Sequence, residues 1–200
     1  DGLPVEGLDT SRDMLDRLRA KARAMNLSPV LHEVPMQDFD LPGRYRTVFV
    51  PATSFGMLVD VDQARAALAC FRRALEPGGE VLIPVSEASA ASEAVADWRE
   101  RRNVRLPDED LHVVVYERIA YEDGGRLQRW QLRYEVEHAE RPTEVFVREH
   151  LLRHYGNREF GALLQAAGFE GIEARRGYTE PQSSDPDDDL VFCARRPSGR

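Results

Sequence analysis

The stretch VEGLDTSRDML, residues 5–15, predicts a short strand that passes directly into a helix. The strand ends at Asp9, and the hydroxyl of Thr10 or Ser11 can cap the helix by accepting a hydrogen bond from its first turn. Apolar residues then recur at the spacing of one helix face, at Met14, Leu15, Leu18 and Ala22. An acid at the end of such a strand is well placed to hold a ligand, so Asp9 is the first candidate site residue.

The next segments repeat this alternation of strand and helix. Strands are predicted at 30–34, at 46–52 and at 80–85, and the second of these is apolar enough to be buried on both faces. A helix lies between the last two strands, and Pro77 with the glycines after it ends that helix. Alternating strands and helices favour an α/β fold with a doubly wound, mostly parallel sheet.

The pattern changes after residue 86. Residues 87–101 look helical, and the segments after them alternate as strands, with the turn at 122–125 joining the first two as a hairpin. These strands are predicted at 111–121, 126–137 and 143–149. The chain then returns to the earlier pattern, with a helix at 157–167, strands at 171–178 and 190–196, and a polar loop at 179–189. The predicted units are therefore 1–86, an inserted antiparallel layer at 87–149, and 150–200.

Composition limits the partners that can be expected. The 200 residues carry a net charge of −8, which argues weakly against a nucleic-acid-binding surface, and no apolar run approaches the roughly 18 residues of a membrane span. Cys70 and Cys193 stand far apart without metal-type spacing, which favours two reduced thiols in a cytoplasmic protein. We expect a small-molecule substrate, no nucleic-acid or membrane partner, no metal, and a monomer or homodimer.

Several segments in order resemble the class I S-adenosylmethionine-dependent methyltransferases. The resemblance rests on VEGLDTSRDMLDRLRAKA, MQDFDLPGRYRTVFVPATSFGML, FRRALEPGGEVLIPV, REFGALLQAAGFEGIEARRGY and LVFCARR. It covers residues 1–86 and 150–197, and it implies a Rossmann-like sheet whose last strand is antiparallel. The inserted strands are similar to a layer that forms a wall or lid over the substrate in small-molecule members of the family.

One part of the family pattern is not found. The family's first strand and its glycine-rich loop, an acid followed by GxGxG, have no counterpart here, since Asp1, Gly2 and Leu3 look like the end of a linker. We therefore expect roughly 40–60 residues of the domain to lie upstream, the usual size of a βαβ unit with its lead-in.

The resemblance implies roles for several residues. Asp9 would accept hydrogen bonds from the ribose of S-adenosylmethionine. Met36 would pack on the adenine, and Asp38 would replace an acid that the family carries where this chain has Pro35. The other implied cofactor-binding residues are Leu8, Thr10, Gln37, Pro51, Ala52 and Thr53. Ser54 and Phe55 would line the substrate.

Aromatic residues concentrate in the insertion, where Trp98, Tyr116 and Trp130 suit either a wall for an apolar or cationic substrate or the core of a small sheet. His150 and His154 would share a helix face if that segment were helical. No third ligand stands nearby, so they are weak candidates for a general base rather than for a metal site.

The leading hypothesis is methyl transfer from S-adenosylmethionine to a nitrogen or oxygen of a small molecule, by in-line displacement with the acceptor held in position. One alternative is an oxidoreductase that binds an NAD-type dinucleotide, because an acid after a second strand also suits the ribose of NAD. The other is a truncated, inactive methyltransferase-like binding domain.

Overall fold

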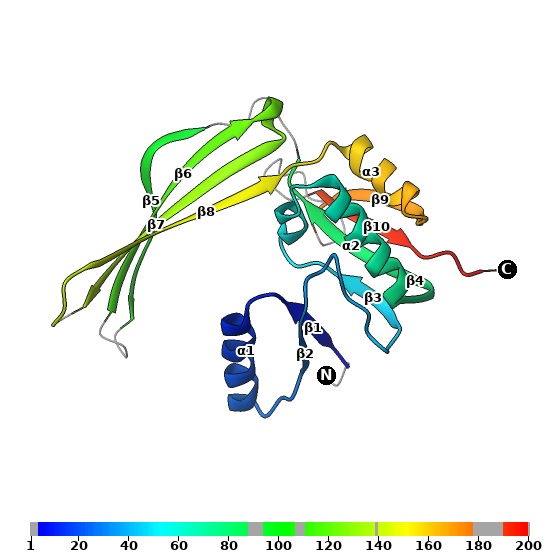
Figure 1. Cartoon of the computed structure of the whole chain (residues 1–200), viewed down its shortest axis with the longest axis horizontal. Coiled ribbons are helices and arrows are strands. Elements are labelled where there is room, and N and C mark those ends of the chain that lie inside the picture. The colour runs from blue at the N-terminus through cyan, green and yellow to red at the C-terminus, as the bar shows by residue number, and fades with distance from the viewer. Residues whose placement is uncertain (1–3, 88–93, 107–110, 139, 178–189, 200) are drawn as a thin grey trace.

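The computed structural model describes residues 4–87, 94–106, 111–138, 140–177 and 190–199. The described strands form three sheets: a parallel pair of β1 and β2, a sheet in the order β3-β4-β10-β9, and a sheet in the order β5-β6-β7-β8 (Figure 1). The predicted loop at 179–189 lies outside the described residues.

The first unit consists of β1 (Glu6–Asp9), α1 (Arg12–Ala24) and β2 (Val30–Glu33), close to the predicted bounds. Ser11 is the cap, since its hydroxyl accepts a hydrogen bond from the N–H of Met14 at 3.3 Å. Asn26 ends the helix with a φ of 55°, a left-handed conformation that asparagine tolerates. The opening stretch therefore folds locally as predicted.

The second unit contains β3 (Tyr45–Phe49), the short 3-10 helix η1 (Ser54–Met57), α2 (Val61–Ala74) and β4 (Leu75–Val85). It also contains α3 (Asn157–Ala166), β9 (Glu170–Arg176) and β10 (Leu190–Arg195). β3 pairs with β4 in parallel, and β10 runs antiparallel between β4 and β9. The predicted α/β fold with an antiparallel last strand is confirmed. α2 ends at Ala74, before the predicted Pro77, because the position preceding a proline disfavours helix.

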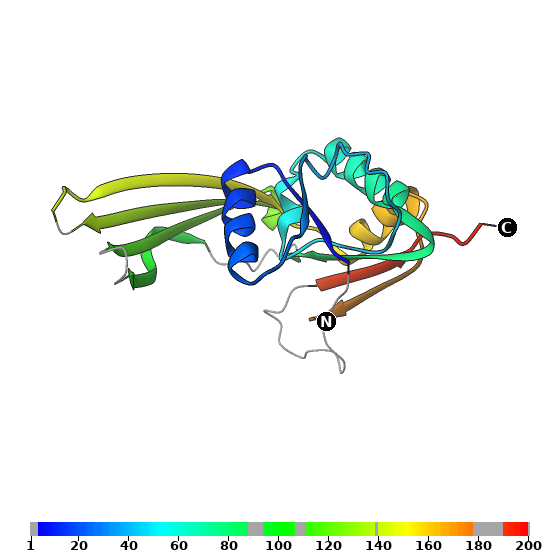
Figure 2. The same ribbon diagram turned by 90° about the horizontal axis from the view of Figure 1, so that it is seen from below.

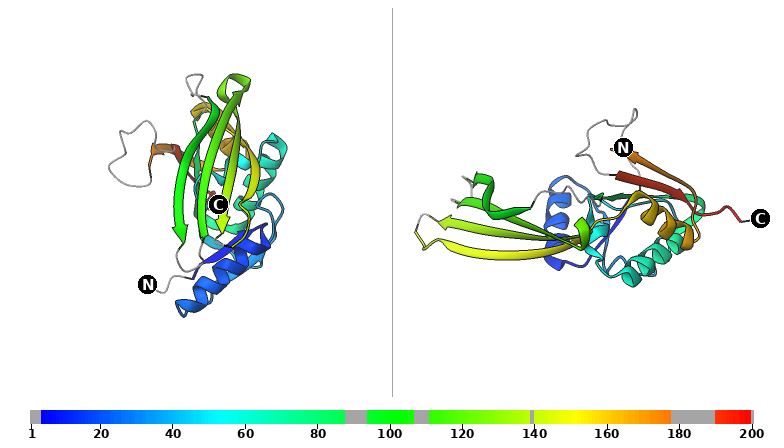
Figure 3. Two further views of the ribbon diagram at one scale, coloured as in Figure 1. Left: turned by 90° about the vertical axis from the view of Figure 1, so that its left-hand side faces the viewer. Right: turned by 90° about the horizontal axis from the view of Figure 1, so that it is seen from above.

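The inserted layer consists of β5 (Val95–Leu106), β6 (Leu111–Glu122), β7 (Leu127–His138) and β8 (Glu144–Arg153), all antiparallel. The predicted hairpin turn is present as η3 (Asp123–Gly125), where Gly124 has a φ of 62°. We call these four strands the lid sheet. Figures 2 and 3 show it projecting to one side of the other sheets as a twisted ribbon.

One helix prediction was wrong in the lid sheet. The described part of residues 87–101 is the strand β5, because its residues pair with β6, for example Val104 with Val113. Helix propensity is a weak preference that such tertiary pairing overrides. β8 continues to Arg153, past the predicted unit boundary at residue 149, so His150 lies on a strand and not on a helix.

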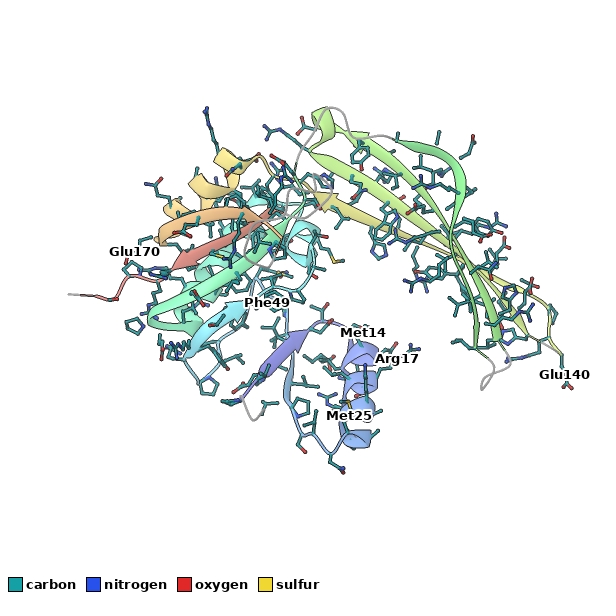
Figure 4. All side chains as sticks on the ribbon, turned by 180° about the vertical axis from the view of Figure 1, so that it is seen from behind. Met14, Arg17, Met25, Phe49, Glu140 and Glu170 are labelled. Carbon is teal, nitrogen blue, oxygen red and sulfur yellow. The ribbon has the colours of Figure 1, made fainter. Side chains whose placement is uncertain are left out.

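Within the described residues, the parallel pair β1-β2 makes no backbone strand pairing with the sheet that contains β3. The predicted strand at 46–52 was expected to be buried on both faces, yet Phe49 is 53% exposed. Figure 4 shows Phe49 on β3 at the side that faces β1. The edges of β1 and β3 therefore face one another across a gap rather than forming one continuous sheet.

Four buried aromatic side chains join the lid sheet to the α/β core. Phe160 of α3 lies 5.2 Å from Phe55 of η1, 5.0 Å from Tyr155 and 4.8 Å from Phe192 of β10, measured between ring centroids. We call these four residues the aromatic cluster. Tyr155 lies two residues after the end of β8, so its burial holds the base of the lid sheet against the core.

We expect Gly56→Ala to destabilise this junction. A Cβ at Gly56 would lie 2.9 Å from the backbone oxygen of Arg153, and a backbone atom cannot swing away as a flexible side chain can. Overpacking of this kind costs about 1–3 kcal/mol of unfolding free energy. Chemical denaturation would measure this cost.

The matched control is Gly161→Ala in α3, where a Cβ meets nothing within 4 Å. Alanine at that helical position should be neutral or stabilising, by up to about 1 kcal/mol. Equal effects of the two substitutions would contradict the close approach at Gly56.

Candidate functional site

A cavity of about 810 Å³ lies between β1 and β3. Carboxyl-end residues of both strands line it, as do Met14 of α1 and His150 of β8. Its other lining residues are mainly apolar and include Val34, Phe39, Leu41, Val48, Phe49 and Met57. Figure 4 shows Met14 at the end of α1 that lies nearest this region. Its volume falls in the range of about 300–1,000 Å³ that is typical of small-molecule and cofactor sites.

Asp9 lines the cavity at the carboxyl end of β1, where the sequence predicted a ligand-holding acid. Its Oδ1 accepts a hydrogen bond from the N–H of Ser11 at 2.8 Å, which fixes the turn into α1. An ionised carboxylate has about four lone-pair sites, so this bond leaves Asp9 able to accept others. The cap role and the ligand role are thus compatible in one side chain.

The other predicted cofactor-binding residues divide into two groups. Leu8, Thr10, Met36 and Pro51 line the cavity. The remaining predicted residues are not among its lining residues, namely Gln37, Asp38, Ala52 and Thr53. Ala52 has a φ of 49°, a left-handed conformation that is unfavourable for a residue with a Cβ. Backbone strain of this kind, directly after β3 and beside Pro51, is typical of ligand-binding turns.

Ser54 and Phe55, which were predicted to line the substrate, lie in different places in the structure. Ser54 lines the cavity, but Phe55 is fully buried in the aromatic cluster and cannot line a substrate. The assignment of Phe55 was therefore wrong, because an apolar residue in a short helix turns inward to pack against α3. Sequence alone could not show that Ser54 points toward the cavity while its neighbour Phe55 points into the core.

The aromatic residues of the lid sheet lie on opposite faces. Trp130 pairs directly across from His150, which lines the cavity, so these two share the cavity-side face. Their ring centroids are 6.0 Å apart. Tyr116 and Trp98 instead stack with Arg133 and Arg118 on the other face. None of Trp98, Tyr116 and Trp130 is among the residues that line the cavity, but Trp130 lies on the face of the lid sheet that carries His150.

His150 and His154 lie in different environments. His150 is partly exposed at the cavity, whereas His154 is buried, with Nε2 3.3 Å from Oε1 of Gln128. Burial lowers the pKa of His154, because a charged imidazolium is disfavoured away from water. Of the two histidines, only His150 reaches the cavity, so it is the better candidate for proton transfer.

Glu117 of β6 was missed by the sequence reasoning. Its side chain is only 7% exposed and accepts hydrogen bonds from Arg99 at 2.6 Å, Arg101 at 2.9 Å and Trp130 Nε1 at 3.2 Å. Burial acts to raise the pKa of Glu117, but these donors outweigh it and hold the pKa below its usual value. Glu117 thereby fixes the orientation of Trp130 on the cavity-side face.

A second missed cluster joins β1 to β3. The hydroxyl of Tyr45 donates a hydrogen bond to Oε2 of Glu6 at 2.8 Å, and His32 Nε2 lies 2.8 Å from the same oxygen. Burial and this bond raise the pKa of Tyr45 to about 12. Glu6 and Tyr45 both line the cavity, so their contact closes the end of the cavity opposite Asp9.

The residues present fit an adenosine-type cofactor better than a metal. The cavity offers apolar walls and, at the carboxyl end of a parallel strand, a carboxylate that can still accept hydrogen bonds. Within the described residues, no group of three or more His, Cys, Asp or Glu side chains is arranged to hold a metal ion. The described helices include none that is both long and apolar enough to cross a membrane.

We expect Glu117→Gln to change how stability depends on pH. A folded-state pKa held below the unfolded value, which is about 4.3, adds stability above that pH and loses it as the pH falls through the folded pKa. The amide cannot titrate, so the variant should lose less stability on acidification than the native protein. At neutral pH it should be less stable by about 1–2 kcal/mol, because two solvent-exposed arginines lose their charged acceptor.

Denaturation at several pH values between neutral and strongly acidic would measure both effects. The control is Glu33→Gln, which removes an exposed ion pair with Arg12 and should change stability by less than about 1 kcal/mol. If the free energy of unfolding changed with pH equally in the native protein and in the Glu117 variant, titration of Glu117 would not contribute to the pH dependence of stability.

Comparisons with known proteins point to one class of enzyme. A family model described as a methyltransferase domain matches residues 2–79. The dTDP-3-amino-3,4,6-trideoxy-alpha-D-glucopyranose N,N-dimethyltransferase of Streptomyces venezuelae is 29% identical over 181 residues, which cover 86% of this chain and 70% of that protein.

Two solved structures share the fold. Streptomyces venezuelae DesVI superposes with a TM-score of 0.74 at 25% identity, over 94% of this chain and 72% of that one. CalS10, an amino pentose methyltransferase from Micromonospora echinaspora solved with S-adenosylmethionine bound, superposes with a TM-score of 0.71 at 26% identity, over 96% of this chain and 73% of that one. These matches favour methyl transfer over the NAD-type oxidoreductase that the sequence left open.

Proposed function

We propose that the accepting atom is the amino nitrogen of a sugar. The chain belongs to the class I S-adenosylmethionine-dependent methyltransferases, and its substrate is a small molecule. The observation that carries the proposal is the shape of the cavity, which reaches from Asp9 at one edge to His150 of the lid sheet. The named relatives that act on amino sugars support this choice of acceptor over an oxygen.

The proposed cofactor contacts follow the cavity lining. S-adenosylmethionine, when bound, supplies a methyl group on a positively charged sulfur. Asp9 accepts hydrogen bonds from the ribose hydroxyls, and Met36 covers the adenine. Leu8, Thr10, Pro51 and Ser54 complete the wall. Contacts from Gln37, Asp38, Ala52 and Thr53 stay predictions.

His150 is the proposed general base. An amine attacks only when its nitrogen lone pair is free, so a proton must leave the ammonium form of the substrate before or during the transfer. A ring nitrogen of His150 would accept the proton that the amine releases. Trp130, fixed by Glu117, packs beside His150 and limits the positions the acceptor can take.

The remaining proposals concern partners, domains and location. We propose that residues 87–149 act as a substrate lid, that the protein is a monomer or homodimer, and that nucleic acid is not a partner, in line with the net charge of −8. The two free cysteines, Cys70 and Cys193, support a reducing, cytoplasmic location. Cell fractionation would test the location directly.

The function can be tested by supplying the full-length protein with S-adenosylmethionine and one of two nucleotide-linked sugars. One sugar carries a free amine, and the other carries a hydroxyl at the same carbon. Mass spectrometry should detect methylation of the amino sugar, together with release of S-adenosylhomocysteine. Methylation of the hydroxyl sugar alone would overturn the proposed acceptor.

Calorimetry distinguishes a methyltransferase from the two alternatives, an NAD-type oxidoreductase and an inactive methyltransferase-like binding domain. Binding of S-adenosylhomocysteine without binding of NAD is the expected result. Binding of NAD alone would restore the oxidoreductase hypothesis, and binding of S-adenosylhomocysteine without turnover of any acceptor would favour a methyltransferase-like binding domain.

We expect Asp9→Asn to weaken S-adenosylhomocysteine binding by about tenfold or more, equivalent to about 1.4 kcal/mol. Asparagine can still accept the hydrogen bond from Ser11, so the turn into α1 should survive while the charge and one acceptor are lost. Calorimetry on the full-length protein would measure the change. Asp13→Asn, an exposed acid outside the cavity lining, is the control, and equal affinities for all three proteins would remove Asp9 from the ribose role.

We expect His150→Gln to lower kcat by about 100-fold with little change in S-adenosylhomocysteine affinity, the usual scale for losing a general base. The loss should shrink at high pH, where the amine substrate is already neutral. His112→Gln is the control, because His112 lies on the opposite face of the lid sheet, bonded to Glu137 and Asn103. A kcat loss that does not vary with pH would argue against proton transfer by His150.

A further inference from the structure

Methionines concentrate at the cavity. The chain has four methionines, and three of them, Met14, Met36 and Met57, line the cavity. They come from separate elements, since Met14 lies in the first turn of α1, Met36 follows β2, and Met57 is the last residue of η1. The fold therefore brings three flexible thioethers to one apolar wall, although they are far apart along the chain.

Two of these thioethers are open to solvent. Met14 is 59% exposed and Met57 is 54% exposed, whereas Met36 is half-buried and packs against the hydrophobic core. The fourth methionine, Met25, is 60% exposed but is not among the lining residues. Figure 4 shows Met14 and Met25 at opposite ends of α1, so one helix carries an exposed methionine at the cavity and another away from it.

We propose that Met14 and Met57 are oxidation sites through which hydrogen peroxide controls the binding of S-adenosylmethionine. The thioether sulfur attacks one peroxide oxygen, the O–O bond breaks, and the second oxygen leaves as water after taking up the proton. The sulfur is thereby oxidised by two electrons to a sulfoxide, which methionine sulfoxide reductases convert back to the thioether. The proposal rests on the proposed function, since it takes the cavity as the cofactor site.

Oxidation would change the character of the cavity wall. A sulfoxide is polar and carries an oxygen that accepts hydrogen bonds, whereas a thioether is apolar. The lining residues of the cavity, such as Val48 and Phe49, are mainly apolar and offer that oxygen no side-chain donor. Because a ligand that covers the sulfoxide removes it from water without a new partner in the wall, binding becomes less favourable.

The two cysteines compete poorly for the same oxidant. The thiolate is the reactive form of cysteine, and burial raises the pKa of Cys193, which keeps this thiol protonated. Cys70 is only 3% exposed, so a peroxide has little access to its sulfur. Exposure therefore ranks Met14, Met25 and Met57 ahead of the other sulfur-containing side chains of the chain.

Brief peroxide treatment of the full-length protein, ended with catalase before Met36 reacts, tests the proposal. Peptide mass spectrometry should find Met14, Met25 and Met57 oxidised. Calorimetry should show that S-adenosylhomocysteine binds the treated protein about tenfold or more weakly than the untreated protein. A methionine sulfoxide reductase should restore the affinity, whereas dithiothreitol, which reverses only the mild oxidation of cysteine, should not.

Variants identify the sulfur atoms that are responsible. Leucine is apolar, close to methionine in volume and resistant to peroxide. The double variant Met14→Leu with Met57→Leu should bind S-adenosylhomocysteine equally well before and after treatment. Met25→Leu is the matched control, because it removes an equally exposed methionine from the same helix, and it should still lose affinity about tenfold. S-adenosylhomocysteine present during treatment should also protect Met14 and Met57 but not Met25.

The outcomes distinguish this proposal from the proposed function. Equal losses of affinity in the native protein and the double variant, or full affinity in the oxidised native protein, would overturn the oxidation proposal alone. If the untreated native protein did not bind S-adenosylhomocysteine, the proposed cofactor site would be wrong, and the oxidation proposal would fall with it.

Discussion

The packing of the aromatic cluster is the contact on which the arrangement of the site depends. Phe55 follows the strand whose end lines the cavity, Tyr155 follows the lid sheet, and both pack on Phe160 of α3. These residues are distant in sequence and fully buried, so the burial of their rings holds three separate segments in one position. Arg126 and Arg153 of the lid sheet also form ion pairs with Glu159 of α3, so the cluster and these pairs together hold the lid sheet over the cavity.

Charge has two different uses within the lid sheet. On the cavity side, one buried carboxylate, Glu117, gathers two arginines and a tryptophan and leaves the wall rigid. On the opposite side, exposed ion pairs such as Arg129 with Glu149 cover the sheet with charge and contribute little each. Glu117 thereby orders the side chains on one face of the lid sheet, and the exposed ion pairs present charge to solvent on the other face. The apolar outer half of β8 is an exception, although the ion pair between Arg133 and Glu135 lies on the strand beside it.

Sequence reasoning located the site better than it resolved its wall. Asp9, Met36, Pro51 and Ser54 were candidates that line the cavity, and each lies at or just after the end of a strand that the sequence predicted. His150 also lines the cavity, although the sequence did not place it on a strand. Phe55 was misplaced, and Trp98 and Tyr116 were left with two alternatives, for one reason: a local sequence pattern does not show toward which side of an element a side chain points. Glu117 was missed because a lone acid in an alternating strand gives no signal of burial until its arginine partners are brought beside it.

The sequence by itself determined the α/β order of elements, the acid after the first strand and the hairpin turn, since each depends on residues that are neighbours along the chain. Only the tertiary structure decided that residues from Val95 onward form a strand, that His150 and not His154 reaches the cavity, and that β1 and β3 face one another across it. These outcomes depend on pairing and burial between segments far apart in sequence, and the free energy of such contacts exceeds the local preferences that a sequence displays.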